Sequence, residues 1–508
     1  MLNARRNQSR SLSRSRRHAR PARESVKPNR TLSVAASLSS TSLMGQHPLT
    51  NRAENERLHN YEKSVKAAFD VIVPTLKKVS GLQNEADFES RAQQIAVEEL
   101  GYKLPESFLQ DVWVQQLDMR RLFAWCMFQT YQNFCDDFYK NDPLANGNDE
   151  NFNSMLQECG FHTLDISPCA DGRLAHVIRY VLRLPYREVR RKSYAGAMFD
   201  IEDSIDKWVE TELMRFREGK PNTADSATRY LKTVVYHYSS IDPDHEGCAA
   251  HGSDTNLAAQ SGIDRLHGFK QAIENTHCCG ASIDHLLIGL DTDTDTIRIH
   301  VPKADGSIEL NKFIDARDIY DATMTMPEDV AKDWISDYVE GENPAMSFGM
   351  VRFITHILIN NLSQMDYVRT YHGNAYQDAG HAERFIGAGI GFEEVQLRNL
   401  TYFSYLNTVE EATADLDVGI KIFSGLNVSH GMPIPIVVRY DYHGNVPGAR
   451  ERAIQHCHRV TDAINSRYSD LTSQGLLHTL LAVRDVNAAS CIEVLANSVT
   501  AQTAQETH

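Results

Sequence analysis

Between residues 150 and 395 the chain alternates segments typical of β-strands with segments typical of helices, and this alternation constrains the fold most. Leu231–Tyr238 is rich in β-branched and aromatic residues, and His285–Val301 holds two short strand patterns around an Asp/Thr turn. Phe348–Tyr371 then has the composition of a mostly buried helix. The pattern predicts an α/β or α+β domain in which neighbouring strands are parallel.

The preceding region, residues 46–148, has the pattern of a helical domain. Glu54–Val79 carries apolar residues three or four positions apart, and Pro74 is expected to kink its end. Phe108–Tyr139 is similarly apolar, and Asn141–Asn153 is typical of a linker because it collects Pro, Gly, Asn and Asp. No cluster of titratable side chains here suggests chemistry, so we expect a docking or packing role.

The last region, residues 396–508, repeats the strand-and-helix character without a second Cys-x-Asp-x-Arg sequence. A strand is expected at Pro433–Tyr440, with helices at Gly448–Arg467 and Ser473–Leu481. A chain of 508 residues is too long for one hydrophobic core, so two to four domains are expected. The composition shifts divide it into a tail at residues 1–45, a helical domain at 46–148, and two further domains at 149–395 and 396–508.

The N-terminal tail differs sharply in charge from the rest of the chain. Residues 1–30 contain nine Arg, one Lys and one Glu, so they carry +9, and the remaining residues carry −24. The first 45 residues also lack Phe, Tyr and Trp and cannot bury enough apolar surface to fold alone. An organelle transit peptide and a nucleic-acid-binding arm are alternatives, but there is no clear amphipathic helix and no nucleic-acid-reading motif. We expect a tether that binds an acidic protein surface.

The cysteines and apolar runs indicate an intracellular, mostly reduced protein. Nine cysteines are too few and too irregularly spaced for a disulfide framework, and the Cys278–Cys279 pair has an unassigned role, with redox chemistry as the alternative to inert burial. No apolar run approaches 18 residues, so no membrane-spanning helix is expected, and the polar N-terminus does not resemble a secretory signal.

A thiolate, a carboxylate and a guanidinium alternate in Cys169-Ala170-Asp171-Gly172-Arg173. At the end of a strand, alternate side chains project to one side, so a Cys ligand would lie beside an Asp–Arg pair. His237 closes the apolar strand pattern, and Cys248 begins a stretch of small residues that can enter a helix. Strand ends of a parallel sheet meet at one edge. Cys169, His237 and Cys248 therefore form a candidate zinc site with one open position.

Other ligand sets remain open at this point. His245 and His251 flank Cys248, and His277 with Cys278 forms another His-Cys pair, so a four-ligand structural zinc that includes Cys278 is an alternative. A zinc hydrolase or deaminase is a second alternative. The deaminase signature, however, needs a Glu beside the His and a Pro-Cys-x-x-Cys sequence, and the second Cys is absent after Cys169.

The chain resembles the β-class carbonic anhydrases, in which Cys-x-Asp-x-Arg precedes a strand-end His and a later Cys. Longer stretches are similar to the divergent branch found in the shells of α-carboxysomes, and the similarity covers about residues 46–508. One departure is the spacing: His and Cys are three apart in the ordinary β-class, whereas His237 and Cys248 are eleven apart, so Tyr238–Gly247 would be a loop insertion. The stretches that carry the resemblance are residues 167–173, 194–203, 277–282 and 380–384.

This resemblance implies a zinc enzyme that converts CO2 and bicarbonate reversibly. Cys169, His237 and Cys248 would hold one Zn²⁺, Asp171 would orient the attacking oxygen, and Arg173 would keep Asp171 away from the metal. Either His251, His245 or buffer would carry the proton away. It also implies a β-carbonic-anhydrase-like catalytic domain followed, after about residue 396, by a degenerate copy without metal.

The resemblance also implies the setting of the enzyme. Its location would be the carboxysome, a bacterial microcompartment in the cytoplasm, where dehydration of bicarbonate supplies CO2 to Rubisco. The tail would bind Rubisco or shell proteins, the protein would form a homo-oligomer, and neither nucleic acid nor a membrane would be a partner. The alternative function is a non-catalytic, zinc-stabilised scaffold in the shell.

Overall fold

We describe the protein from a computed structural model. The chain divides into two units, residues 1–45 and 46–508, and the elements discussed here belong to the second. None of the described helices is long and apolar enough to cross a membrane. The predictions for the basic tail and for the Cys278–Cys279 pair lie outside the described residues. The structure describes residues 45–144, 151–223, 226–277, 282–303, 305–378, 380–405, 413–488 and 491–501.

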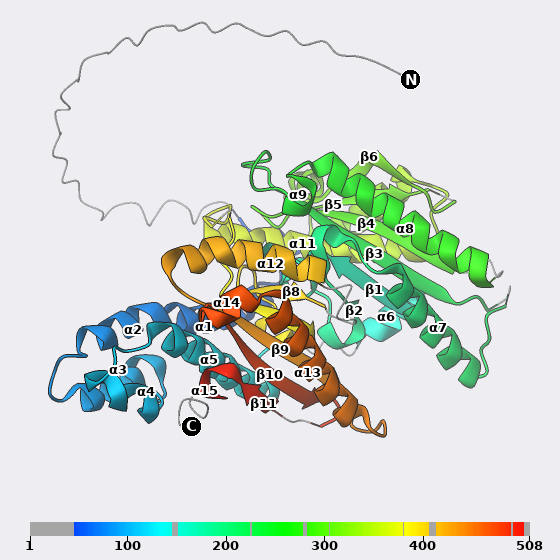
Figure 1. Ribbon diagram of the computed structural model, residues 1–508. Helices are drawn as coiled ribbons and strands as arrows, with labels where there is room; N and C mark the ends of the chain where they lie inside the picture. Colours follow the sequence, from blue (N-terminus) through cyan, green and yellow to red (C-terminus); the bar gives the residue numbers. More distant parts are fainter. Residues whose placement is uncertain are drawn as a thin grey trace, which may run out of the picture. The chain divides into compact units, whose positions relative to one another are not determined.

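The N-terminal helices form a layer of their own, coloured blue to cyan in Figure 1. The predicted helix at 54–79 is two helices, because the helix is interrupted at Val71. Pro74 stands in the first turn of the second helix, where no backbone donor is needed. The long helix α5 begins only after Asp118, whose carboxylate caps its N-terminus by accepting from the N–H groups of Arg120 and Arg121. The layer consists of α1 (Arg52–Asp70), α2 (Ile72–Gly81), α3 (Phe88–Leu100), α4 (Glu106–Gln110) and α5 (Met119–Asn141).

The first sheet has six strands in the order β2-β1-β3-β4-β5-β6. The first four strands run parallel, and β5 and β6 are antiparallel additions at one edge. The predicted strand at Leu231–Tyr238 and the strand-turn-strand at His285–Val301 are confirmed as parts of this sheet. The strands are β1 (Thr163–Pro168), β2 (Arg190–Arg191), β3 (Arg229–Tyr238), β4 (Ser282–Asp291), β5 (Ile297–Pro302) and β6 (Ile308–Asp315).

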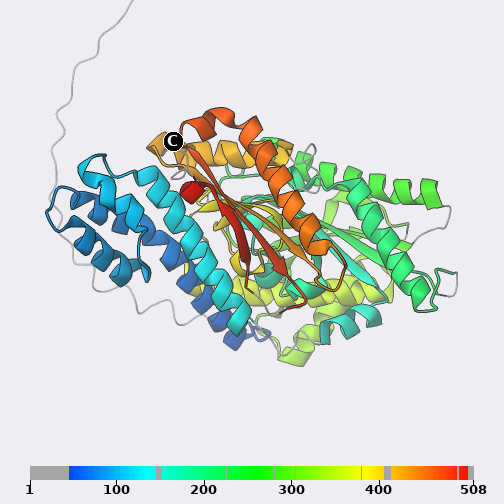
Figure 2. The same cartoon turned by 60° about the horizontal axis from the view of Figure 1, so that its bottom comes forward.

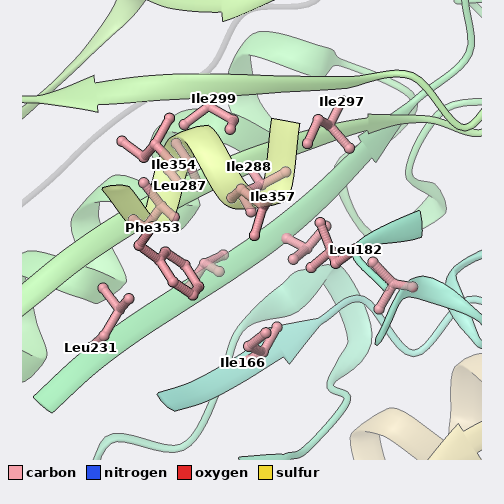
Figure 3. Packing of buried hydrophobic residues seen from close by; sticks show 14 of the residues in the cluster. Ile166, Leu182, Leu231, Leu287, Ile288, Ile297, Ile299, Phe353, Ile354 and Ile357 are labelled. Atoms are coloured by element: carbon pink, nitrogen blue, oxygen red, sulfur yellow. The ribbon is translucent and has the colours of Figure 1, made fainter. Parts of the chain in front are cut away.

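Helices bury both faces of this sheet. On one face, α8 (Thr255–His277) lies across β3 and β4 and packs against α7 (Ile201–Arg217). On the other, Phe353, Ile354 and Ile357 of α11 (Phe348–His372) pack on strand residues such as Ile288, as Figure 3 shows. Because helices cover both faces of the sheet, β3 is buried along nearly its whole length.

The second sheet repeats the order of the first with one strand fewer. Its order, β8-β7-β9-β10-β11, matches β2-β1-β3-β4-β5, and among these five matched strands only the last pairing is antiparallel in each sheet. Figure 2 shows α13 (Ala449–Arg467) lying along the face of this sheet. The predicted second copy of the catalytic architecture is therefore present. Its strands are β7 (Phe385–Ile390), β8 (Thr401–Ser404), β9 (Ile434–Tyr442), β10 (Leu477–Asp485) and β11 (Glu493–Asn497).

Two predictions in this region differ from the structure. The helix predicted at 473–481 is wrong, because α14 (Ser469–Ser473) ends before Gly475 and the following apolar run is strand β10. That strand is buried on both faces, so its sequence lacks the alternation that would distinguish it from a buried helix. The predicted boundary at residue 396 falls inside the second sheet, because β7 precedes it. We propose that the C-terminal domain begins just before β7.

A buried arginine stands near the end of β9, the counterpart of strand β3. Arg439 is fully buried, and its guanidinium donates to Glu394 at 2.7 Å and to Asp441 at 2.7 and 2.8 Å. The hydroxyls of Tyr131 and Tyr139, both on α5, accept from the same group at 2.9 and 2.8 Å. The cluster therefore joins the N-terminal helices to the second sheet through charged hydrogen bonds.

Candidate active site

Two neighbouring strands of the first sheet bring the first two predicted ligands together. Cys169 follows the last residue of β1, and His237 is the penultimate residue of β3. The backbone N–H of Cys169 donates to the carbonyl of Val235 at 3.1 Å, so the parallel pairing continues beyond the end of β1. The two side chains consequently meet at the carboxyl edge of the sheet, where α/β proteins commonly bind ligands.

Cys248 reaches the same place from a loop rather than from a strand. Residues 239–247 leave β3 and return, so that Cys248 lies directly before a short 3-10 helix at Ala249–His251. Its Sγ atom lies 4.0 Å from Sγ of Cys169. The ligand atoms of Cys169, His237 and Cys248 all lie within 4.8 Å of one another, and the three residues are buried.

These three donors fit a zinc ion. Two thiolates 2.3 Å from a tetrahedral zinc would stand about 3.8 Å apart, close to the 4.0 Å between the two sulfurs, which form no disulfide. Both ring nitrogens of His237 are buried without a hydrogen-bond partner, so one is available as a ligand. The hydrogen bond between the thiols raises the pKa of Cys169 and lowers the pKa of Cys248. Three ligands leave a fourth tetrahedral position for water.

Asp171 and Arg173 form a bidentate pair beside these ligands. Nε of Arg173 donates to Oδ1 of Asp171 at 3.0 Å, and Nη2 donates to Oδ2 at 2.7 Å. The carbonyl of Glu246 accepts from Nη1 of Arg173 at 2.7 Å, which ties the pair to the loop that carries Cys248. Burial raises the pKa of Asp171, but Arg173, with His381 and His237, holds that pKa well below its usual range. Asp171 is therefore a carboxylate at neutral pH.

His381 and Glu383 adjoin this pair, and no role was expected for either of them from the sequence. Oε1 of Glu383 accepts from the backbone N–H of Gly172 at 3.1 Å and lies 2.9 Å from Nδ1 of His381. Nε2 of His381 lies 3.9 Å from Oδ2 of Asp171. Burial lowers the pKa of His381, but Asp171 and Glu383 together raise it to about 9. Only the resemblance of residues 380–384 to the family marked this segment.

The second sheet supplies part of the pocket wall. The N–H of Asn399 donates to the carbonyl of Gly172 at 2.9 Å, so the chain that leads into β8 lies alongside the Cys169–Arg173 segment. Tyr402 of β8, with Val418 and Ile422 of α12 (Thr413–Leu426), lines the pocket. The complete lining is Cys169, Asp171, Ala195, Gly196, His237, Cys248, Ala249, Ala250, His381, Tyr402, Val418 and Ile422.

The other histidines considered from the sequence do not join the three donors. His245 is 77 % exposed at its side chain and pairs with Asp242. Nε2 of His251 lies 3.2 Å from the carbonyl oxygen of Gly196. Nothing is described for the side chain of His277 or for Cys278, so the four-ligand alternative lies outside the described residues. Within the described ranges, the second sheet carries no comparable cluster of metal-ligating side chains.

Gly172 offers a test of the Glu383 contact. A Cβ atom at this position would stand 2.5 Å from Cγ and Oε1 of Glu383, so we expect Gly172→Ala to displace that carboxylate and the neighbouring Asp171. Misplacement by about 1 Å can cost on the order of 100-fold in rate, so the expected result is a loss of at least about tenfold in the CO2 hydration that the resemblance implies, with the metal retained.

Gly341→Ala is the matched control, because a Cβ atom there meets nothing within 4 Å and alanine favours the helix. Activity and metal content are measured on both purified variants. Unchanged activity in Gly172→Ala would show that the position of Glu383 does not matter for the reaction.

Comparison with known proteins gives matches along almost the whole folded chain. Residues 47–139, 151–381 and 382–499 match the N-terminal, catalytic and C-terminal parts of the family described as carboxysome shell carbonic anhydrase. The C-terminal match begins just ahead of β7, in agreement with the sheet to which that strand belongs.

Individual relatives carry the same description. The carboxysome shell carbonic anhydrase of Prochlorococcus marinus (strain MIT 9313) is 56 % identical over 458 residues, 89 % of each chain. That of Parasynechococcus marenigrum (strain WH8102) is 55 % identical and covers 91 % of this chain and 81 % of its own. That of Halothiobacillus neapolitanus (strain ATCC 23641 / c2) is 45 % identical, with 89 % and 90 % covered. On these matches and on the arrangement of Cys169, His237 and Cys248, the chain belongs to the carboxysome shell carbonic anhydrase family.

Proposed function

We propose that this chain converts CO2 and bicarbonate reversibly at one zinc ion held by Cys169, His237 and Cys248. The chain is a carbonic anhydrase of the carboxysome, as its family membership implies. The observation that carries the zinc assignment is the meeting of two thiols and an unpartnered imidazole within 4.8 Å, beside the Asp171–Arg173 pair. Soft sulfur donors with one imidazole favour zinc over magnesium or calcium.

When bound, zinc lowers the pKa of a coordinated water towards neutrality and so supplies the nucleophile. Asp171 would accept a hydrogen bond from that nucleophile and orient it towards CO2. Its Oδ2 atom lies 3.5 Å from Nε2 of His237, so the carboxylate stands beside the proposed ligands. Arg173 donates to both oxygens of Asp171, and these two hydrogen bonds oppose a movement of Asp171 onto the metal.

The pocket wall suits the substrate. CO2 is small and carries no charge, and Ala195, Ala249, Val418 and Ile422 offer it an apolar surface beside the ligands. Val418 and Ile422 stand one helical turn apart on the same face of α12. The catalytic domain alone would leave this side of the pocket open, so the metal-free copy serves the active site as a wall.

The test is stopped-flow CO2 hydration combined with metal analysis on the full-length protein. The expected result is about one zinc per chain and rapid hydration that a chelator abolishes and added zinc restores. Stoichiometric zinc without hydration would support the alternative, a zinc-stabilised shell scaffold. Absence of zinc from an active enzyme would contradict the assignment of the metal.

The partners of the protein are a separate proposal. Residues 1–45 would bind an acidic surface on Rubisco or on a shell protein, since nine Arg and one Lys in the first thirty residues can bind by charge. The folded chain would assemble as a homo-oligomer. Dehydration of bicarbonate in the carboxysome would then release CO2 close to Rubisco.

Removal of the tail is the corresponding prediction. We expect a variant that begins at Gly45 to hydrate CO2 at the normal rate and to lose co-sedimentation with Rubisco. Binding of the intact chain should weaken steeply with salt, because the screening length falls to about 3 Å near 1 M. A full-length control with the nine tail arginines changed to lysine keeps the charge and should bind. Unchanged Rubisco binding without the tail would move the binding site to the helical domain.

A further inference from the structure

The Asp/Thr turn between β4 and β5 has no part in the reaction proposed above. Residues 291–296 form this turn and have the sequence Asp-Thr-Asp-Thr-Asp-Thr. Its three acidic residues, Asp291, Asp293 and Asp295, are all fully buried. A buried carboxyl group is costly unless it accepts hydrogen bonds, so the donors around these three side chains show what the turn holds in place.

Asp293 holds the first residues of the loop that follows β3. Its Oδ2 atom accepts from Oγ of Ser239 at 2.7 Å and from the backbone N–H of Ile241 at 2.8 Å. Asp291 accepts from the residue between them, through the backbone N–H of Ser240 at 3.2 Å and its Oγ at 2.8 Å. The turn therefore binds three consecutive residues at the point where the chain leaves the sheet.

The middle of this loop is exposed, so apolar packing does not fix its position. Residues 240, 241 and 243–245 are exposed, and Ile241 is 63 % exposed. Within residues 239–247, only the two ends, Ser239 and Gly247, are buried. A segment with few buried apolar contacts opens locally at low cost, so the hydrogen bonds at its ends decide where it lies.

Further hydrogen bonds connect the start of the loop to Cys248. The N–H of Asp242 donates to Oγ of Ser239, and the N–H of Glu246 donates to the carbonyl of Asp242, each at 2.9 Å. The carbonyl of Glu246 in turn accepts from Arg173, and Cys248 follows two residues later. The loop is thus held by the Asp/Thr turn where it leaves β3 and by Arg173 just before the metal ligand.

Other contacts fix the turn itself. Oδ2 of Asp295 accepts from the hydroxyl of Tyr376 and from the amide of Gln364, each at 2.8 Å. The same oxygen lies 2.7 Å from Nε2 of His176. The carbonyl of Thr292 accepts from Arg398 at 3.2 Å. These contacts make the turn a fixed support for the loop rather than a mobile connection between two strands.

We propose that Asp293 is a positioning residue for Cys248, because it fixes the start of the loop that carries this ligand. The inference rests on the proposed zinc site. Strand pairing places Cys169 and His237, but no strand places Cys248, so its position depends on the contacts of the loop. Contacts that hold a metal ligand in place contribute to the affinity for the metal.

The experiment compares Asp293→Ala with the wild-type full-length protein. Zinc affinity is measured by competition with a chromogenic chelator, and we expect it to fall about tenfold, the lower end of the range for contacts that support a metal ligand. Hydrogen–deuterium exchange should show a loss of protection at residues 239–248. Asp293→Asn should restore part of both, because it keeps an acceptor oxygen and its nitrogen can replace Oδ1, which has no partner.

Asp366→Ala is the matched control for a buried carboxyl group. Asp366 lies on α11, is 2 % exposed, and does not line the active-site pocket. It accepts from the N–H of His47 at 2.7 Å and from the hydroxyls of Thr50 and Tyr320 at 2.5 and 2.6 Å. Its loss should lower the melting temperature as Asp293→Ala does, but leave the zinc affinity and the protection of residues 239–248 unchanged.

Ser239→Ala keeps the test decisive if Asp293→Ala does not fold. It removes the hydroxyl that donates to Asp293 and accepts from Asp242, and it should weaken zinc binding in the same direction. Unchanged zinc affinity in the folded variants of this contact, or an equal loss in Asp366→Ala, would overturn the proposal. A wild-type protein that binds no zinc would instead contradict the metal site, and the exchange of residues 239–248 would then decide the role of Asp293 in the loop.

Discussion

Cys169→Ser is expected to lose both the bound zinc and the CO2 hydration activity. A thiolate supplies negative charge and a soft donor, whereas a serine hydroxyl remains protonated at neutral pH and is a poor zinc ligand. The residue is 5 % exposed, and its Sγ lies 4.0 Å from Sγ of Cys248, the second proposed thiolate ligand. Metal content by mass spectrometry and hydration by stopped flow give the two readouts.

Cys457→Ser is the matched control for this substitution. Cys457 is also fully buried, but it lies against strand β10, where its Sγ is 3.4 Å from the carbonyl of Ala482. Serine can make the same hydrogen bond, so zinc content and activity should stay unchanged. A Cys169→Ser protein that keeps stoichiometric zinc and full activity would remove this site from consideration.

Asp171→Asn should keep the zinc and lower the turnover number by about two to four orders of magnitude, the usual range for loss of a positioned proton acceptor. The amide oxygen accepts more weakly than a carboxylate, and the amide nitrogen would face Nη2 of Arg173, donor against donor. The measurement is the turnover number at saturating CO2 on protein of known zinc content. Asp242→Asn, at an exposed loop position paired with His245, is the control and should be neutral.

Arg173→Ala tests the other half of the pair. Without the bidentate grip, Asp171 is free to turn towards the metal and take the fourth position, so activity should fall to a similar extent. A crystal structure of the variant with Asp171 still turned away from zinc would contradict this route, and full activity in Asp171→Asn would contradict the role of the carboxylate itself.

The strand ends of the site were predictable, because they depend on local patterns. Cys169 and His237 each follow from an apolar strand and from the rule that parallel strands place their carboxyl ends at one edge. Cys248 lies eleven residues after His237, a spacing that fits no local rule. It could be predicted only from its residue type and from the family resemblance. The loop between them is closed by long-range contacts, such as that of Glu246 with Arg173.

The remainder of the site was not predictable from local patterns. His381 and Glu383 lie about 200 residues after the turn that they contact, and neither has a spacing relation to it. Val418 and Ile422 belong to a helix whose apolar face would be expected to pack on its own sheet. Strand β10 was mistaken for a helix because both faces are buried, so neither period could be recognised.

Because two similar sheets belong to one chain, the active-site pocket does not depend on the concentration of the protein. An active site whose wall comes from a second sheet depends on that sheet remaining in place, and separate subunits would part as their concentration fell. Here the peptide between α11 and β7 holds the second sheet at a fixed, high effective concentration. The pocket wall therefore stays in place at any protein concentration.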